Sequence, residues 1–257
     1  MLLTLDIGNT NIKAGLFEGE ELRHYWRIST SRNYTSDEMG VFFTTLLGHE
    51  NLAGRDVDGI LISSVVPTVN FTVEHMCRDY FHRDPLMVAP GIRTGIDLKY
   101  ENPRELGSDR ICNAVAAYNL YGGPCIFIDF GTATSLGAMD ARGSFLGGSI
   151  CPGIKLAREA LVSGTAKLPH FELNIPEHVI GKNTVANLQS GIIFGYVGQI
   201  DYLVRRFRQE MGVEKCRVIA TGGMSRLIAS QSETITDVDG LLTLKGMRII
   251  WEKNRKA

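Results

Sequence analysis

Several signals of an extracellular, membrane or nucleic-acid-binding protein are scarce or missing in this 257-residue sequence. Its five cysteines are scattered, odd in number and never arranged as Cys-x-x-Cys, which predicts reduced thiols in the cytoplasm. No apolar run approaches the roughly 18 residues that a spanning helix needs, and no basic stretch precedes the apolar N-terminal residues. The net charge of −1 supplies no large basic surface for nucleic acid or anionic lipid. We therefore expect a cytoplasmic protein whose partners are small molecules or other proteins.

A Walker A phosphate loop is also absent, so phosphoryl transfer by this chain needs a different template. What the sequence does contain is a repeat: two apolar runs end in Asp-x-Gly followed by small polar residues, with the two aspartates 123 residues apart. The motifs are Asp6-Ile7-Gly8-Asn9-Thr10-Asn11 and Asp129-Phe130-Gly131-Thr132-Ala133-Thr134. A strand that delivers an acid and then a glycine turn presents backbone N–H and hydroxyl donors beside a carboxylate. This combination suits phosphate oxygens together with a cation.

A hairpin turn would explain either motif alone, because Asp, Gly and Asn are favoured turn residues. The repetition argues against that explanation, because an acid directly after an apolar run needs a cation or a donor to meet. Thr221-Gly222-Gly223 adds a third loop after a strand, where backbone can approach a flat or anionic ligand. The ordered set matches the phosphate-1, phosphate-2 and adenosine elements of the actin, Hsp70 and sugar-kinase superfold.

The expected order of elements repeats as well. Each half is predicted to open with a three-stranded meander and to continue with alternating helices and strands. We expect an α/β protein with two ribonuclease H-like domains, 1–120 and 121–257, and a nucleotide in the cleft between them. The longer elements expected are helices over 36–48, 67–81, 103–121 and 184–211 and strands over 59–63, 125–129, 133–139, 144–151 and 217–220.

Two further segments have both a structural and a functional interpretation. Gly107-Ser108-Asp109-Arg110 can be a helix start with a solvated ion pair, or a loop whose carboxylate meets an acceptor hydroxyl and whose arginine holds an anionic substrate. The run from Gly147 to Gly153 can be a strand and turn, or a place where a ligand or second backbone comes close.

The whole chain resembles the type III pantothenate kinases, which belong to this superfold. The marks of the resemblance are Asp6-x-Gly-Asn-Thr-Asn, Tyr100, Gly107-Ser108-Asp109-Arg110, Asp129-x-Gly-Thr-Ala-Thr, Gly147-Gly-x-Ile-x-Pro-Gly153, Thr184 and Thr221-Gly-Gly.

The resemblance implies ATP-dependent phosphorylation of pantothenate to 4′-phosphopantothenate, the first step toward coenzyme A. It implies that Asp109 is the general base, that Asp6 lies near magnesium, and that Asp129 binds potassium or ammonium. The implied pantothenate-binding residues are Tyr100, Gly107, Ser108, Asp109, Arg110 and Thr184. The implied ATP-binding residues are Asp6, Ile7, Gly8, Asn9, Thr10, Asn11, Ile12, Lys13, Thr132, Gly222 and Gly223. For Lys13, a purely structural role as a lysine on the surface of a strand is at least as well supported as ATP binding.

Two other functions fit the same fold. A transcription-activating regulator has been described among relatives, although the near-neutral charge and the missing helix-turn-helix pattern disfavour direct DNA binding. An actin-like or Hsp70-like nucleotide switch is the other, although those proteins are longer and lack the Gly-x-Asp-Arg segment.

The predicted helix 184–211 also carries Gly191, Gly195 and Gly198. Glycine inside a helix costs about 0.5–1 kcal/mol relative to alanine, so this spacing implies that something packs closely against the helix. Packing on the chain's own sheet is one explanation. The resemblance implies the other, a homodimer in which Thr184 reaches the pantothenate pocket of the neighbouring subunit.

Overall fold

A computed structural model describes residues 1–255 of the chain. The chain divides into two compact units. Unit 1 contains residues 1–95, residues 101–116 and the C-terminal segment from Thr243, and unit 2 contains residues 96–100 and 117–242. The C-terminal helix therefore belongs to unit 1. The domains predicted from the sequence, 1–120 and 121–257, place it in the second domain.

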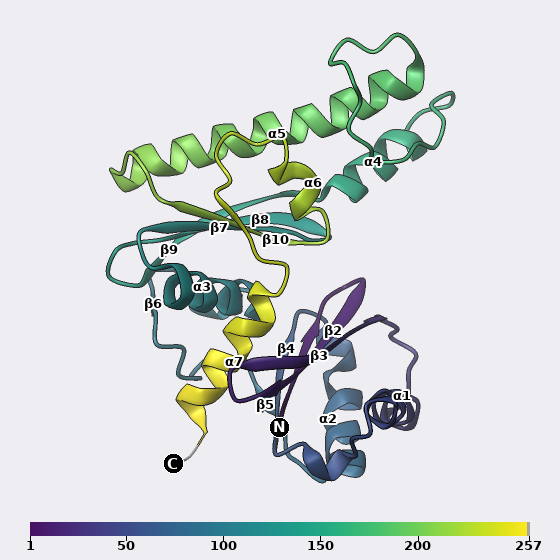
Figure 1. Ribbon diagram of the computed structural model, residues 1–257, viewed down its shortest axis with the longest axis vertical. Coiled ribbons are helices and arrows are strands. Elements are labelled where there is room, and N and C mark those ends of the chain that lie inside the picture. Colours follow the sequence, from purple (N-terminus) through teal and green to yellow (C-terminus); the bar gives the residue numbers. More distant parts are fainter. Residues whose placement is uncertain (256–257) are drawn as a thin grey trace. The chain divides into compact units, whose positions relative to one another are not determined.

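The sheet of unit 1 has the strand order β3-β2-β1-β4-β5. Strands β1 to β3 form an antiparallel meander, and β4 and β5 join parallel to β1. The strands are β1 (Leu2–Ile7), β2 (Asn11–Glu18), β3 (Glu21–Ser29), β4 (Gly59–Ser64) and β5 (Leu86–Met87). The helices are α1 (Ser36–His49), α2 (Pro67–Phe81), α3 (Ser108–Tyr121), which continues into unit 2, and α7 (Leu242–Asn254), with 3-10 turns at Gly54–Asp56 and Pro103–Glu105. Helices α1 and α2 lie on one side of this sheet (Figure 1).

Successive side chains of β1 point to opposite faces of the sheet, and the two faces pack against different helices. Leu3, Leu5 and Ile7 belong to a buried core that also contains residues of α1 and α2. Thr4 and Asp6 point to the other face, because successive side chains of a strand alternate. Helix α7 packs on that face, where Leu244 lies against Gly15. This face therefore carries the acid that the sequence singled out.

The sheet of unit 2 repeats this topology with the order β11-β10-β7-β8-β9-β6. Apart from the edge strand β6, the two orders correspond: β3-β2-β1-β4-β5 in the first sheet matches β9-β8-β7-β10-β11 in the second. This is expected for a duplicated fold. The strands are β6 (Asp97–Leu98), β7 (Cys125–Phe130), β8 (Ala133–Met139), β9 (Ser144–Pro152), β10 (Arg217–Gly222) and β11 (Asp237–Val238). The remaining helices are α4 (Ile154–Ser163), α5 (Thr184–Met211) and α6 (Ser225–Ala229).

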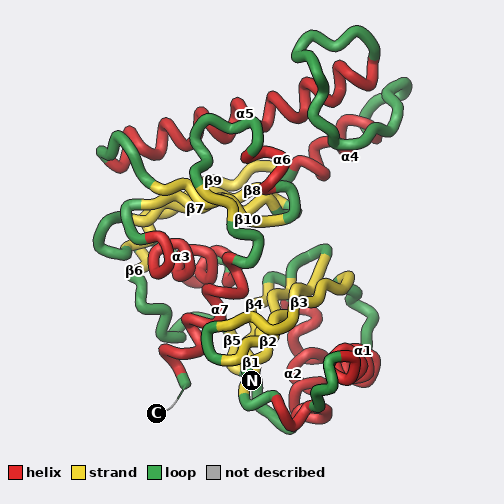
Figure 2. The backbone as a smooth tube through the Cα atoms, viewed as in Figure 1, coloured by secondary structure: helices red, strands yellow, loops and turns green. Residues whose placement is uncertain are grey.

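Helix α5 covers one face of this second sheet (Figure 2). Its boundaries are those predicted, because the Asn183 side chain accepts a hydrogen bond from Ala186 N and Gly212 ends the helix in a left-handed conformation. Ile126, Ile128 and Phe130 of β7 share a core with α5, so Phe127 and Asp129 point to the opposite face. Within residues 1–255, no helix is both long and apolar enough to cross a membrane.

The three glycines of α5 do not pack on the chain's own sheet. Gly191, Gly195 and Gly198 are exposed. A Cβ atom built on any of them meets no other described atom within 4 Å. The explanation by close packing within the chain is therefore wrong for residues 1–255, and the cost of these glycines has to be offset by something else.

The predicted helix over 103–121 is wrong in its first turn. Pro103–Glu105 is a separate 3-10 turn, started by the Asn102 side chain, which accepts a hydrogen bond from Arg104 N. Leu106 is extended, and α3 begins at Ser108. The break places Gly107 in a loop directly before the helix, as the helix-start interpretation of Gly107–Arg110 expects and the helix predicted from Pro103 does not.

A buried carboxylate joins α5 to the segment before β11, and we expect it to make unit 2 sensitive to acid. Asp201 is 4% exposed and accepts hydrogen bonds from the hydroxyls of Ser232 and Thr234 and from Glu233 N and Thr234 N. Burial acts to raise the pKa of Asp201, but these hydrogen bonds together lower it below its usual value.

A lowered pKa contributes stability that is present above the unfolded value of about 3.9 and is lost as pH falls through the folded pKa. We expect Asp201→Asn to lower the free energy of unfolding by about 1–3 kcal/mol at pH 7 and to flatten its decline below pH 4. Urea unfolding at pH 7 and pH 3.5 measures both effects, with the exposed Glu210→Gln as control. A loss of equal size at the two pH values would contradict the assignment.

Candidate active site

Asp6 is the centre of a polar cluster in unit 1. Its side chain is buried near the end of β1, where Lys13 Nζ donates to Asp6 Oδ2 at 3.2 Å from the neighbouring strand β2. Burial raises the pKa of Asp6, the charge of Lys13 lowers it, and the charge of Asp109 raises it again. The net shift is upward, so Asp6 lies where a further positive charge would stabilise its ionised form. Lys13 is a direct partner of this acid, not only a surface lysine.

The turn after β1 is closed by backbone and side-chain hydrogen bonds. Gly8 N donates to Asn11 O at 3.0 Å, and Asn9 and Thr10 are exposed. Thr30, directly after β3, holds this turn twice: its hydroxyl donates to Gly8 O at 2.6 Å and its N–H donates to Thr10 O at 3.0 Å. Sequence reasoning did not identify Thr30, because a lone threonine after a strand has no distinctive pattern.

The start of α3 brings a second acid into unit 1's cluster. Asp109 Oδ1 accepts a hydrogen bond from Arg110 N at 2.8 Å, and the Arg110 side chain is buried. A Cβ on Gly107 would lie 2.6 Å from Asp109 Oδ1, so the glycine leaves the space that the carboxylate occupies. Ser108 is fastened to β4, because its hydroxyl donates to Ser64 O at 3.1 Å. The predicted Gly-x-Asp-Arg segment is therefore ordered at a helix start, with its acid near Asp6.

The second Asp-x-Gly motif forms a separate cluster in unit 2. Asp129 is 9% exposed near the end of β7, and Gly222 at the end of β10 lies beside it with φ of +90°. A Cβ on Gly222 would lie 2.5 Å from Asp129 Oδ1 and 2.6 Å from Phe130 O, so a carboxylate and a carbonyl oxygen border the same space. Thr132 is exposed, and its carbonyl accepts from Gly153 N at 3.1 Å.

Two predicted substrate residues, Tyr100 and Thr184, belong to unit 2. Tyr100 is half-buried against Phe145, with ring centroids 6.1 Å apart. Thr184 is the first residue of α5 and is exposed. Gly223, the last predicted ATP-binding residue, is exposed after β10.

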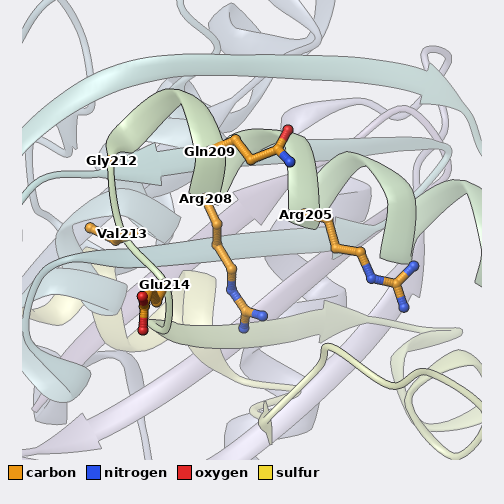
Figure 3. A pocket seen from close by; sticks show the side chains of 6 residues that line it. All are labelled: Arg205, Arg208, Gln209, Gly212, Val213 and Glu214. Atoms are coloured by element: carbon orange, nitrogen blue, oxygen red, sulfur yellow. The ribbon is translucent and has the colours of Figure 1, made fainter.

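A hollow of about 480 Å³ lies at the other end of α5 and contains none of the predicted site residues (Figure 3). Its lining residues are Arg205, Arg208, Gln209, Gly212, Val213 and Glu214. Arg205 is paired with Glu233, and Arg208 donates to Cys216 O at 3.3 Å, so both arginines have structural partners. We do not assign the hollow to the active site.

Two sheets that share one strand order apart from β6, each with an Asp-x-Gly turn after the first strand of its meander, define the class. It is a two-domain α/β protein of the actin, Hsp70 and sugar-kinase superfold. Solved structures share the fold. A Campylobacter jejuni protein described as a Baf family transcriptional activator is 20% identical, with a TM-score of 0.65 and 98% of each chain covered. Component A of (R)-2-hydroxyglutaryl-CoA dehydratase from Acidaminococcus fermentans is 12% identical, with a TM-score of 0.54 and 99% of each chain covered.

The sequence comparisons identify the family. The family model of type III pantothenate kinase matches residues 2–206. A protein named Type III pantothenate kinase from Geobacillus kaustophilus (strain HTA426) is 50% identical over 254 residues, which cover 99% of this chain and 98% of that protein. The chain therefore belongs to the type III pantothenate kinase family, and the resemblance read from its motifs is confirmed.

Proposed function

We propose that this protein transfers the γ-phosphoryl group of ATP to the primary hydroxyl of pantothenate, which yields 4′-phosphopantothenate in the first step of coenzyme A biosynthesis. The observation that carries the proposal is the pair of acids in unit 1 of a chain from this family. Asp109, in the first turn of α3, is close enough to Asp6 for its charge to raise the pKa of Asp6. Asp6 can act on the ATP phosphates through magnesium, and Asp109 can act on the hydroxyl group that accepts the phosphoryl group.

Asp109 is the proposed general base. It takes the proton of the pantothenate hydroxyl while that oxygen attacks the γ-phosphorus, and the bond to the β–γ bridging oxygen breaks. Because the transition state of phosphoryl transfer is loose, positioning and charge supply most of the catalysis. Gly107, Ser108, Arg110, Tyr100 and Thr184 are the proposed positioning and binding residues for pantothenate.

The turn between β1 and β2 is the proposed phosphate-binding element. Its exposed residues, Asn9 and Thr10, offer backbone and side-chain donors, and Lys13 adds a positive charge from β2. Thr132, Gly222 and Gly223 are the proposed ATP contacts of unit 2. The proposal for Lys13 is strengthened by its contact with Asp6.

Two cations fit the residues present. The Asp6 carboxylate offers the oxygen ligand that Mg²⁺ prefers, so we place the magnesium of MgATP near it. Asp129 Oδ1 and Phe130 O border the space beside Gly222, and carboxylate and carbonyl oxygens are ligands for potassium or ammonium. A monovalent cation bound there would reduce the repulsion between Asp129 and the ATP phosphates.

We further propose that the enzyme is a cytoplasmic homodimer in which α5 meets its partner. The open surface over the three glycines of α5 supports this, as does the exposure of Tyr202 and Val185 on the same helix. In such a dimer, Thr184 reaches the pantothenate pocket of the neighbouring subunit.

We expect Gly195→Leu to give a monomer that loses pantothenate binding more than ATP binding, because a branched side chain would hold two helices apart. Sedimentation velocity and calorimetric titration of both ligands measure the effect. Gln209→Leu, which adds a leucine to an exposed position near the other end of α5, is the control. A wild-type protein that sediments as an active monomer at assay concentration would refute the dimer.

A coupled kinase assay tests the proposed function. Wild-type protein is supplied with MgATP and a panel of small hydroxyl acids, with potassium present or replaced by sodium. We expect ADP release with pantothenate and potassium only. ATP hydrolysis that is indifferent to pantothenate would favour a nucleotide switch, and turnover of another hydroxyl acid alone would replace the substrate.

A further inference from the structure

The end of β4 and the first turn of α3 are joined by two serine hydroxyls. Ser63 Oγ donates to Ser108 Oγ at 2.9 Å, and Ser108 Oγ donates in turn to Ser64 O at 3.1 Å. Ser63 is 0% exposed and Ser108 is 7% exposed. A buried hydroxyl that loses its partner pays the full cost of desolvation, so the two serines hold each other in one arrangement. The first turn of α3 is thereby tied to the sheet at a defined place.

The two hydrogen-bonded serines are next to the two acids, Asp6 and Asp109. Ser63 is the register partner of Asp6 in the parallel pairing of β1 with β4, and Ser108 directly precedes Asp109. The hydrogen bond from Ser63 to Ser108 and that from Ser108 to Ser64 O connect β4 to the first turn of α3, which carries Asp109. The connection fixes the place of Asp109 relative to β4, the strand that pairs with β1 beside Asp6.

We propose that Ser63 is a positioning residue for phosphoryl transfer, which acts through Ser108 to hold Asp109 in place relative to Asp6. The inference rests on the proposed kinase function and adds a residue that has no contact with substrate, because Ser63 is fully buried. Its hydroxyl matters for the location of the general base and not for binding ATP.

The test compares Ser63→Ala with a matched loss of a buried hydroxyl elsewhere in the same sheet. Thr4 is also 0% exposed and donates from Oγ1 to Gly15 O at 3.0 Å, so Thr4→Val removes one buried hydrogen bond without touching α3. We expect both variants to lower Tm by a few degrees. Ser63→Ala alone should lower kcat by about 10- to 100-fold while KM for ATP stays within about twofold, because a small displacement of a reacting group has effects of this size. Ser63→Thr, which keeps the hydroxyl, should recover most of kcat even if its extra methyl lowers Tm.

Hydrogen exchange provides a readout that needs no activity. Amide protons in the first turn of α3 should exchange faster in Ser63→Ala than in wild type, and Thr4→Val should leave them unchanged. Unchanged kcat or unchanged exchange in Ser63→Ala would overturn the inference, as would Ser63→Thr with kcat as low as that of Ser63→Ala. A wild-type protein that does not phosphorylate pantothenate would refute the proposed function instead, and the exchange data would still decide whether Ser63 holds the turn.

Discussion

Asp109→Asn is expected to lower kcat by about 10²- to 10⁴-fold, which is the usual worth of a positioned general base. The amide oxygen of asparagine can still accept the hydrogen bond from Arg110 N, so the start of α3 should keep its shape. An amide cannot take the proton of the pantothenate hydroxyl, however. We therefore expect the loss to appear in kcat, with the dissociation constants of ATP and pantothenate nearly unchanged.

Steady-state kinetics and calorimetric titration of both ligands measure these quantities. Asp79→Asn, the same exchange at an exposed acid on α2, is the matched control and should behave as wild type. A near-normal kcat for Asp109→Asn would remove this residue from the mechanism. A large loss of binding instead would assign Asp109 to substrate recognition.

Asp129→Ala is expected to abolish the dependence on potassium or ammonium together with most of the rate. Asp129 would supply the only charged ligand proposed for the cation, so removal of the carboxylate removes the main reason for the cation to bind. Rates measured in potassium and in sodium-only buffer at equal ionic strength should differ strongly for wild type and little for the variant.

Asp129→Asn separates charge from shape, because it keeps the size of the side chain and one oxygen. We expect it to bind the cation weakly and to need a higher potassium concentration for half-maximal rate. Glu210→Ala, at an exposed acid of α5, controls for a general change in charge. Equal wild-type rates in the two buffers would refute the cation site.

How far the sequence predicts the structure depends on whether a signal is local. Helix α5 was predicted at both ends because its capping residues, Asn183 and Gly212, adjoin it in the chain. The turns after Asp6 and Asp129 could be predicted because the pattern of an acid and a glycine after an apolar run occurs twice in the chain. The start of α3 at Ser108 agrees with the helix-start interpretation of Gly107–Arg110. The separate 3-10 turn before it was not predicted, because a 3-10 turn and an α-helix have similar local signals.

Features that depend on contacts between distant segments could not be predicted. The grouping of α7 with unit 1 depends on packing such as that of Leu244 on Gly15, more than 200 residues away in sequence. Ser63 follows a run of apolar residues, so the local sequence indicates only that it is buried. Its partner Ser108 is 45 residues away in the chain, and no local pattern indicates that contact. Thr30 was missed for the same reason.

The equal strand order of the two sheets has an evolutionary consequence. Asp6 and Asp129 occupy corresponding places, but the register partner of Asp6 on β2 is Lys13, whereas that of Asp129 on β8 is Ser135. If both halves descend from one ancestral unit, the two copies now neutralise the same acid in different ways. Asp6 has an ammonium group fixed to the chain in addition to the proposed magnesium, whereas Asp129, on our proposal, has a monovalent ion from solution. The cation requirement would then record how the copies diverged and would tie the activity of this enzyme to the ionic composition of the cell.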